Sequence, residues 1–317
     1  MPAVWLSGGH RKWVEDALLA SGHFEYLASF AHDARTIHIK ANSMKPEQLR
    51  FFLDSGAFSA WSAGKPVDID EYIEFIKANI DVIDVYACLD VIPGKPGGKP
   101  TSKQRDEAAA ATWQNYLYMK AQGLDPLPVY HYGEDVKWLH NMLEHKVEYI
   151  GLGGLVGIPS ALRRLWLDRV FTLITDDQGK PIIKTHGFGM TSVPLVFRYP
   201  WYSVDSTSWI KTSQFGGVYL PRLDADGDFM FDVTPEVITV SDQSPNQQQD
   251  GKHVNTIGPT TRGYLDKWLS FCGVTLEEAA RNYYYRARCN AMFFKTVGER
   301  RKDHVFKPSL GTKGLFY

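Results

Sequence analysis

Several features that would place this chain in a common class are missing from it. Its three cysteines, Cys88, Cys272 and Cys289, stand far apart and form no C-x-x-C pair, which argues against a disulfide framework and against an ordinary zinc cluster. No run of about 18 apolar residues occurs, and the start MPAVWLSGGHRKW lacks the long apolar stretch of a secretory signal. We therefore expect a cytoplasmic protein with reduced thiols and no membrane partner.

The chain also lacks a strong net charge, since the formal value is −1, but its charges are distributed unevenly. Residues 281–317 hold nine Lys or Arg and two acidic residues, a net +7, which leaves −8 for the rest. Clustered cations interleaved with Tyr and Phe suit a polyanion whose bases can stack. A solvated amphipathic helix explains the same composition, and charge alone does not decide between them. The residues predicted to contact a nucleic-acid backbone are Arg281, Arg286, Arg288, Arg300, Arg301 and Lys302.

Apolar residues make up 44% of the 317 residues, enough for the core of one large domain. Short runs rich in Val, Ile and Tyr alternate with helical patterns, as in repeated βα units. This alternation favours a (β/α)8 TIM-like barrel, although a doubly wound sheet has a similar periodicity. The predicted strands are 3–7, 50–56, 84–92, 127–132, 149–154, 182–187 and 202–209, and the predicted helices lie near 10–20, 69–79, 102–122, 135–145, 159–174 and 190–198.

The pattern changes after Trp209. Residues of about 214–258 predict a small β-rich insertion that ends in a loop rich in Ser, Pro, Gln and Asn. A basic helical segment is predicted over about 260–317, with a capping-box-like start at Thr275. We find no internal repeat, so we treat residues 1–317 as one barrel domain with an insertion.

Polar or glycine-rich motifs follow four predicted strands. Asp54, Asp90 and Asp205 each stand at the end of an apolar run, and YIGLGG ends in Gly153 and Gly154. The carboxyl ends of barrel strands meet on one face, so three carboxylates are predicted to share a pocket. Each aspartate could instead begin a turn, since Asp-Ser sequences do so often. Three carboxylates in one pocket suit the cleavage of an N-glycosidic bond, which needs a group to stabilise or capture the sugar and another to move protons.

Six of these segments resemble, in order, the motifs of tRNA-guanine transglycosylases. DSGAFS is similar to the family's DSG motif, whose aspartate and aromatic residue line the guanine pocket, here Asp54 and Phe58. VDSTSW resembles the nucleophile motif and points to Asp205, and ACLDVIP resembles the strand that ends in a base-reading aspartate, here Asp90. The resemblance implies a barrel enzyme in which Asp205 is the nucleophile and Asp54 its partner carboxylate.

The remaining three matches imply further contacts with the base. VYHYG stands where the family has V-Q-G-G, so His131 takes the place of a glutamine that reads the base. YIGLGGLVG is similar to the family's G-G-L-A-V-G, which implies that backbone amides of Gly153, Gly154 and Leu155 approach the base. THGFGMTS places His186 and Gly187 where the family has a stacking methionine, so His186 and Phe58 are expected to enclose the purine ring.

Two departures from the family concern nucleic-acid docking. The C-x-C-x-x-C…His zinc site is missing, and IKTSQFGG stands where an arginine pair often follows the nucleophile. The chain therefore looks most like the phage and bacterial DNA-guanine transglycosylases, which insert 7-deazaguanine bases into DNA. On this resemblance we expect no metal or other cofactor, a free 7-deazaguanine such as the 7-cyano form as co-substrate, and DNA in preference to tRNA as partner. The alternatives are a tRNA-guanine transglycosylase without zinc, a barrel glycoside hydrolase and a non-catalytic nucleic-acid-binding protein.

Overall fold

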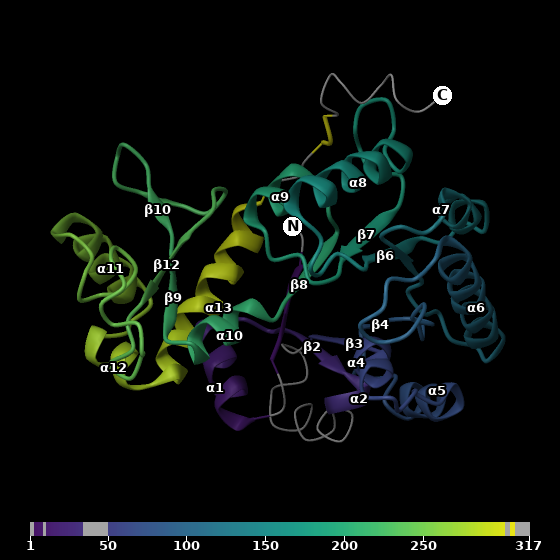
Figure 1. Cartoon of the computed structure of the whole chain (residues 1–317), viewed down its shortest axis with the longest axis horizontal. Helices are drawn as coiled ribbons and strands as arrows, with labels where there is room; N and C mark the ends of the chain where they lie inside the picture. Colours follow the sequence, from purple (N-terminus) through teal and green to yellow (C-terminus); the bar gives the residue numbers. More distant parts are fainter. Residues whose placement is uncertain (1–2, 9–10, 34–49, 302–304, 308–317) are drawn as a thin grey trace.

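The computed structural model describes residues 3–8, 11–33, 50–301 and 305–307, and its centre is a curled parallel sheet of eight strands (Figure 1). Neighbouring strands follow the order β4-β3-β2-β1-β8-β7-β6-β5. A parallel bridge between Ala87 and Leu127 then joins β4 to the start of β5. This is the strand order of a TIM-like (β/α)8 barrel, which confirms the predicted fold. The strands are β1 Ala3–Ser7, β2 Glu25–Ser29, β3 Arg50–Asp54, β4 Val85–Tyr86, β5 Val129–His131, β6 Tyr149–Gly153, β7 Lys184–Gly187 and β8 Ser203–Ser206.

Seven of the eight strands fall within the predicted segments, and the sequence analysis missed β2. This strand has only five residues, EYLAS, of which the first and last are only partly buried. It nevertheless lies between β1 and β3, with Leu27 paired to Ser7 on one side and to Phe52 on the other. EYLAS contains no Val, Ile or Thr and begins with a charged residue, so its composition does not mark a strand; its pairing with both neighbours does.

Helices alternate with the strands and surround the barrel (Figure 1). Several begin at side-chain caps that the sequence places before them: Asp68 accepts from two backbone amides of α5, and Thr101 forms a capping box with Gln104 at α6. The helices of the barrel are α1 Lys12–Ser21, α2 Phe30–Asp33, α4 Ala57–Ser62, α5 Ile69–Ala78, α6 Ser102–Ala121, α7 Val136–Glu144, α8 Ser160–Leu173, α9 Val193–Arg198 and α10 Ser208–Gln214.

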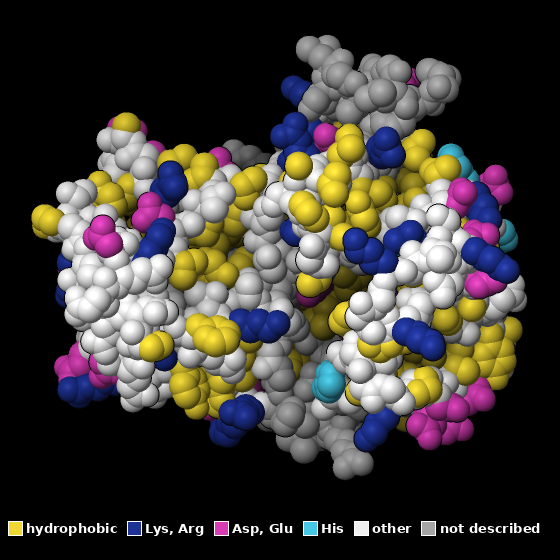
Figure 2. Space-filling view, in the orientation of Figure 1, with side chains coloured by type: hydrophobic (Ala, Val, Ile, Leu, Met, Phe, Trp, Pro, Cys, Tyr) yellow, Lys and Arg dark blue, Asp and Glu magenta, His cyan; other side chains and the backbone are white. Residues whose placement is uncertain are grey.

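The chain leaves the barrel after α10 and forms a lobe beside it (Figures 1 and 2). In this lobe β9, Gly217–Leu220, pairs antiparallel with β12, Glu236–Thr239, and β10, Arg222–Leu223, pairs with β11, Phe229–Met230. Three helices follow: α11 Pro259–Phe271, α12 Leu276–Arg281 and α13 Tyr283–Arg300. The fold therefore includes the predicted β-rich insertion and the C-terminal helical segment.

Helix α13 packs against both α1 and α10 and attaches the lobe to the barrel. Asn290, fully buried, donates from Nδ2 to the carbonyls of Trp209 and Gly217, while its Oδ1 accepts from the amide of Tyr219. One amide side chain thus satisfies backbone groups of α10 and β9 together. Such a fully paired buried group fixes the position of a helix more narrowly than apolar contact does.

The core has two parts. Inside the barrel lie Trp5, Leu27, Phe52, Ala87, Leu127 and Val129, one or two from each of five strands or strand ends, and a larger apolar cluster fills the space between barrel and helices. The inner residues close the lower part of the barrel, so the polar strand ends described below stand on a packed floor. Among the helices within the described ranges, none is both long and apolar enough to cross a membrane.

Candidate active site

The three predicted carboxylates meet at the carboxyl end of the barrel. Asp54 ends β3, Asp90 follows β4, and Asp205 lies in β8. Burial, followed by the charges of Asp90 and Asp205, raises the pKa of Asp54 to about 7. Asp54 therefore exchanges a proton near neutral pH, as a general acid or base must.

The turn after Asp54 requires glycine. Gly56 has a φ of 73°, and a Cβ there would stand 2.5 Å from the Cβ of Ala31. The amide of Gly56 in turn donates to Asp54 Oδ2 over 3.2 Å. The DSG motif is thus explained by local geometry: glycine allows the chain to turn tightly and return an N–H to the carboxylate.

Asp205 is 7% exposed and held at one of its two oxygens. The amide of Gly189, in the loop after β7, donates to Oδ1 over 2.7 Å, and Nε2 of His186 lies 3.3 Å from the same atom. No described residue donates to Oδ2. The carboxylate is therefore oriented and keeps one oxygen available for attack on a carbon centre.

A chain of polar side chains leads from Asp205 into the barrel. Nδ1 of His186 lies 2.6 Å from Oγ of Ser203, and that oxygen lies 2.5 Å from the hydroxyl of Tyr149. His186 and Ser203 are fully buried. Burial lowers the pKa of His186, with Asp205 acting in the opposite sense, so the imidazole is neutral at pH 7. Sequence analysis identified neither Tyr149 nor Ser203, because nothing in YIGLG or YSVDS marks a polar side chain as pointing inward.

His131 connects Asp90 to a carboxylate that the sequence analysis missed. Its Nε2 lies 3.1 Å from Asp90 Oδ2, and its Nδ1 lies 3.0 Å from Glu134 Oε1. Burial alone lowers the pKa of His131, but Asp90 and Glu134 outweigh it and raise this pKa well above its ordinary value. The imidazole is therefore a cation at neutral pH, and Asp90 Oδ1 stays without a hydrogen-bond partner among the described residues.

The expected base-contacting residues differ in accessibility. Phe58 is 66% exposed and lies beside Trp61, so its ring is available at the mouth of the barrel. Gly153 is buried directly against His131, since a Cβ there would stand 2.9 Å from the imidazole. Leu155 is buried as well, and of the three residues in this loop Gly154 is the exposed one. The amide contact implied by the resemblance is thus accessible at Gly154.

The prediction that His186 stacks on the base is wrong. The imidazole is fully buried between Phe52 and Phe188, with ring centroids 4.5 Å and 4.4 Å away, so no base can reach its face. Gly187 is buried too, because a Cβ there would contact Met190 and Trp201 at about 3 Å. His186 instead contacts the carboxylate of Asp205 from inside the barrel.

The prediction of a basic nucleic-acid surface fails for two of its six residues. Arg286 and Arg301 are buried and donate to backbone carbonyls: Arg286 to those of Ser213 and Ala279, and Arg301 to those of Tyr199 and Trp201. Their cations stabilise the docking of α13 and the chain end. They were predicted wrongly because composition does not distinguish a buried arginine from an exposed one.

Of the other four basic residues, the three that the structure describes do not form one patch. Arg281 is paired with Glu277 of its own helix, Arg288 is half-buried, and Arg300 lies over the ring of Phe231. Helix α13 has 18 residues and is about 27 Å long at 1.5 Å per residue; Arg300 ends it, whereas Arg281 precedes its first residue. Lys302 lies outside the described residues.

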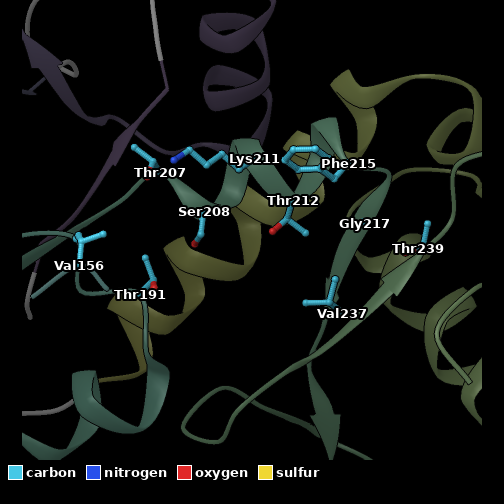
Figure 3. A pocket seen from close by; sticks show the side chains of 11 residues that line it. Val156, Thr191, Thr207, Ser208, Lys211, Thr212, Phe215, Gly217, Val237 and Thr239 are labelled. Atoms are coloured by element: carbon cyan, nitrogen blue, oxygen red, sulfur yellow. The ribbon is translucent and has the colours of Figure 1, made fainter. Parts of the chain in front are cut away.

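Two cavities adjoin the carboxylates. One, of about 570 Å³, is lined by Asp90 together with Trp61, Leu89 and Val91. The other, of about 420 Å³, lies between the barrel mouth and the β9–β12 pair, and it shares Gly189 with the Asp205 contact (Figure 3). Thr207, Ser208 and Lys211 line it at the start of α10, and Phe215, 83% exposed, lines it at the end of the same helix.

The cavity near Asp90 is apolar and has the dimensions of a small-ligand site. The cavity of Figure 3 combines one cation, several hydroxyls and an exposed ring, which are the groups that bind phosphates and stack on bases. Within the described ranges, no group of three or more His, Cys, Asp or Glu side chains could hold a metal ion.

No protein-family model matches this chain, and no curated protein sequence is significantly similar to it.

Proposed function

We propose that this protein exchanges a guanine in a nucleic acid for a 7-deazaguanine base through a covalent sugar–aspartate intermediate. One observation carries the proposal: a carboxylate with a free oxygen, Asp205, shares the barrel mouth with Asp54, whose pKa is near 7. A double displacement at a sugar carbon needs this pair, one group to bond the carbon and one to move the proton.

In the first half-reaction Oδ2 of Asp205 attacks C1′ of a nucleotide extruded from the stack. The bond between C1′ and the base breaks, its electron pair remains on the ring nitrogen, and the protonated Asp54 carboxyl supplies the proton. In the second half-reaction the Asp54 carboxylate removes a proton from the ring nitrogen of the incoming base. That nitrogen attacks C1′, and the ester to Asp205 breaks. The polymer backbone is not cut, and no oxidant or metal is consumed.

The cavity beside Asp90 supports recognition of a guanine-like base. A carboxylate there accepts hydrogen bonds from a ring N–H and an exocyclic amine, and adenine offers no donor at that ring position. Asp90 Oδ1 lacks a partner, while His131 holds Oδ2. Trp61, in the wall of this cavity, and the exposed Phe58 supply aromatic rings beside it.

The cavity of Figure 3 supports a polymeric substrate. It opens next to Asp205 through Gly189, so a strand whose nucleotide reaches the nucleophile would pass over Lys211 and Phe215. A phosphate fits the ammonium and hydroxyl groups there, and a flanking base fits the exposed ring. In this proposal the nucleic-acid strand therefore binds at this cavity and not at the basic C-terminal segment.

Separate pools of DNA and tRNA whose guanines carry a label test the function. Loss of label from DNA guanine when 7-cyano-7-deazaguanine is added, and its absence with Asp205→Asn, are the expected results. Exchange in tRNA alone would replace DNA by tRNA in the proposal. Release of guanine without insertion would indicate a hydrolase, and no reaction with either polymer would overturn the proposed function.

A further inference from the structure

We propose that Tyr149, Ser203 and His186 form a directional chain of polar contacts that orients Asp205 with Oδ2 free, and that His186 is a positioning residue for the nucleophile. We call these three residues the inner chain. The inference rests on the proposed function in taking Asp205 as the nucleophile.

The inner chain crosses the interior of the barrel through three adjacent strands. Tyr149 belongs to β6, His186 to β7, and Ser203 and Asp205 to β8. The successive separations are 2.5 Å from Tyr149 to Ser203, 2.6 Å from Ser203 to His186 Nδ1 and 3.3 Å from His186 Nε2 to Asp205. Phe52 and Phe188 pack against the imidazole, so its ring has no room to turn away.

Tyr149 sets the direction of the chain. Among the described residues, Ser203 Oγ is the one acceptor within reach of its hydroxyl, so the phenol donates to the serine. The single proton of Ser203 then points to Nδ1 of His186, which must accept it. A neutral imidazole that accepts at Nδ1 carries its proton on Nε2 and presents it to Asp205 Oδ1.

The opposite direction is unfavourable at both ends of the chain. The phenol proton would lose its acceptor, and the lone pair of Nε2 would face a carboxylate oxygen at 3.3 Å. Leaving such groups unpaired inside a protein is destabilising. The inner chain therefore directs Nε2–H toward the oxygen of Asp205 that the Gly189 amide already binds: the amide donates over 2.7 Å, whereas Nε2 lies in a longer contact of 3.3 Å with no closer partner among the described residues.

This arrangement decides which carboxylate at the barrel mouth keeps the negative charge. The charges of Asp90 and Asp205 both raise the pKa of Asp54. On the strands that flank Asp205, the neighbouring residues are Trp5 in β1 and His186 in β7. Donors directed at Oδ1 favour the anion at Asp205. The proton shared near neutral pH then resides on Asp54, where the leaving base needs it.

Three variants and a matched control test the inner chain by the pH dependence of adduct formation. Tyr149→Phe and His186→Asn remove the terminal donor and the Nε2 donor. We expect the acid limb of the single-turnover rate to move up by about one pH unit, so that the loss approaches about tenfold at the acid end of the profile and disappears toward pH 8. His186→Gln places an amide donor where Nε2 stood and should recover part of the rate. A uniform loss at every pH, or equal behaviour of the Asn and Gln variants, would contradict a positioning role.

The control is Tyr202→Phe. Tyr202 touches Tyr149 with ring centroids 5.1 Å apart, is 45% exposed, and its hydroxyl has no hydrogen bond to a described residue. Its substitution removes a phenol hydroxyl beside the inner chain without interrupting it. We expect the wild-type pH profile.

A second measurement is independent of activity. Nitrogen NMR of the histidine rings, with His186 assigned through His186→Gln, reports which ring nitrogen carries the proton. We expect a neutral ring protonated at Nε2 in the wild type, and a mixture of tautomers or a changed Nδ1 shift in Tyr149→Phe. A wild-type proton at Nδ1 would overturn the inner chain even if base exchange occurs. If no exchange is found while the Nε2 tautomer is, the proposed function fails and the inner chain stands.

Discussion

Nε2 of His131 lies 3.1 Å from Oδ2 of Asp90, and the other ring nitrogen is bound by Glu134 at 3.0 Å. The imidazole is thus enclosed by two carboxylates that keep it protonated and keep one oxygen of Asp90 occupied. This relationship fixes Asp90 at the wall of a cavity and leaves its other oxygen, Oδ1, buried and without a hydrogen-bond partner among the described residues.

His131→Gln should lower the free energy of unfolding by roughly 2 kcal/mol at pH 6, because a hydrogen-bonded charge pair is lost. The pKa of His131 is raised in the folded protein, so its stabilisation is complete below the unfolded value of 6.5 and is lost as pH rises through the raised value. Urea unfolding of the wild type and of His131→Gln from pH 6 to 10 measures their difference in free energy of unfolding, which should decrease as pH rises. The exposed His140→Gln is the control, and a difference that grows with pH would contradict the assignment.

Asp54→Asn should abolish exchange yet stabilise the fold at alkaline pH. The pKa of Asp54 rises from 3.8 to about 7 on folding, so its contribution to stability falls as pH rises through that window. The variant should therefore gain on the order of 2–4 kcal/mol over the wild type between pH 4 and pH 8. Urea unfolding at the two pH values measures the gain. Asp81→Asn, at an exposed position, should show no such trend.

The rate of adduct formation should fall as pH rises above about 7, because the protonated form of Asp54 supplies the proton to the leaving base. Trapping the covalent product in denaturant after short incubations from pH 5 to 9 gives this profile. Asp205→Asn should form no adduct at any pH while remaining folded. A profile that rises steadily to pH 9 would remove Asp54 from the role of acid.

Lys211→Gln should weaken single-stranded nucleic-acid binding and lower the slope of log affinity against log salt by about 1. Phe215→Ala should weaken binding by about 1–3 kcal/mol, the value of one base stacked on an aromatic ring, with the salt slope unchanged. Fluorescence anisotropy with a labelled oligonucleotide at several salt concentrations measures both effects. Lys103→Gln, on the exposed face of α6, serves as control. An equal loss of affinity in this variant would mean that binding depends on the total charge of the protein and not on the position of Lys211.

Arg286→Ala should destabilise the fold without changing nucleic-acid affinity. The guanidinium is buried and donates to backbone carbonyls of Ser213 and Ala279, so its removal leaves acceptors unpaired at the docking of α13, at a loss of roughly 2–4 kcal/mol. Thermal unfolding measures the loss of stability, and the anisotropy assay described above measures nucleic-acid affinity. The exposed Arg281→Gln should alter stability by less than about 0.5 kcal/mol. If Arg286→Ala lost nucleic-acid affinity and kept its stability, Arg286 would be a nucleic-acid contact and this prediction would be wrong.

The barrel and the meeting of its carboxylates could be predicted from the sequence, because both depend on local patterns. Alternating apolar runs and helices define the βα order, and each of Asp54, Asp90 and Asp205 directly follows or ends such a run. Once the strands are parallel, their ends must share one face. Strand β2 could not be predicted because EYLAS contains no Val, Ile or Thr, and only its pairing with β1 and β3 makes it a strand.

Only the tertiary structure decided which polar side chains face inward and which cations are buried. His186 lies inside the barrel because β7 packs its side chain against Phe52, a residue more than 130 positions away. Arg286 is buried because α13 docks on α10, whose carbonyls it satisfies. Such contacts depend on the positions of distant segments, whereas composition and spacing describe neighbours along the chain. The sequence therefore determined which reactive side chains stand at the barrel mouth, and tertiary packing determined how those side chains are oriented.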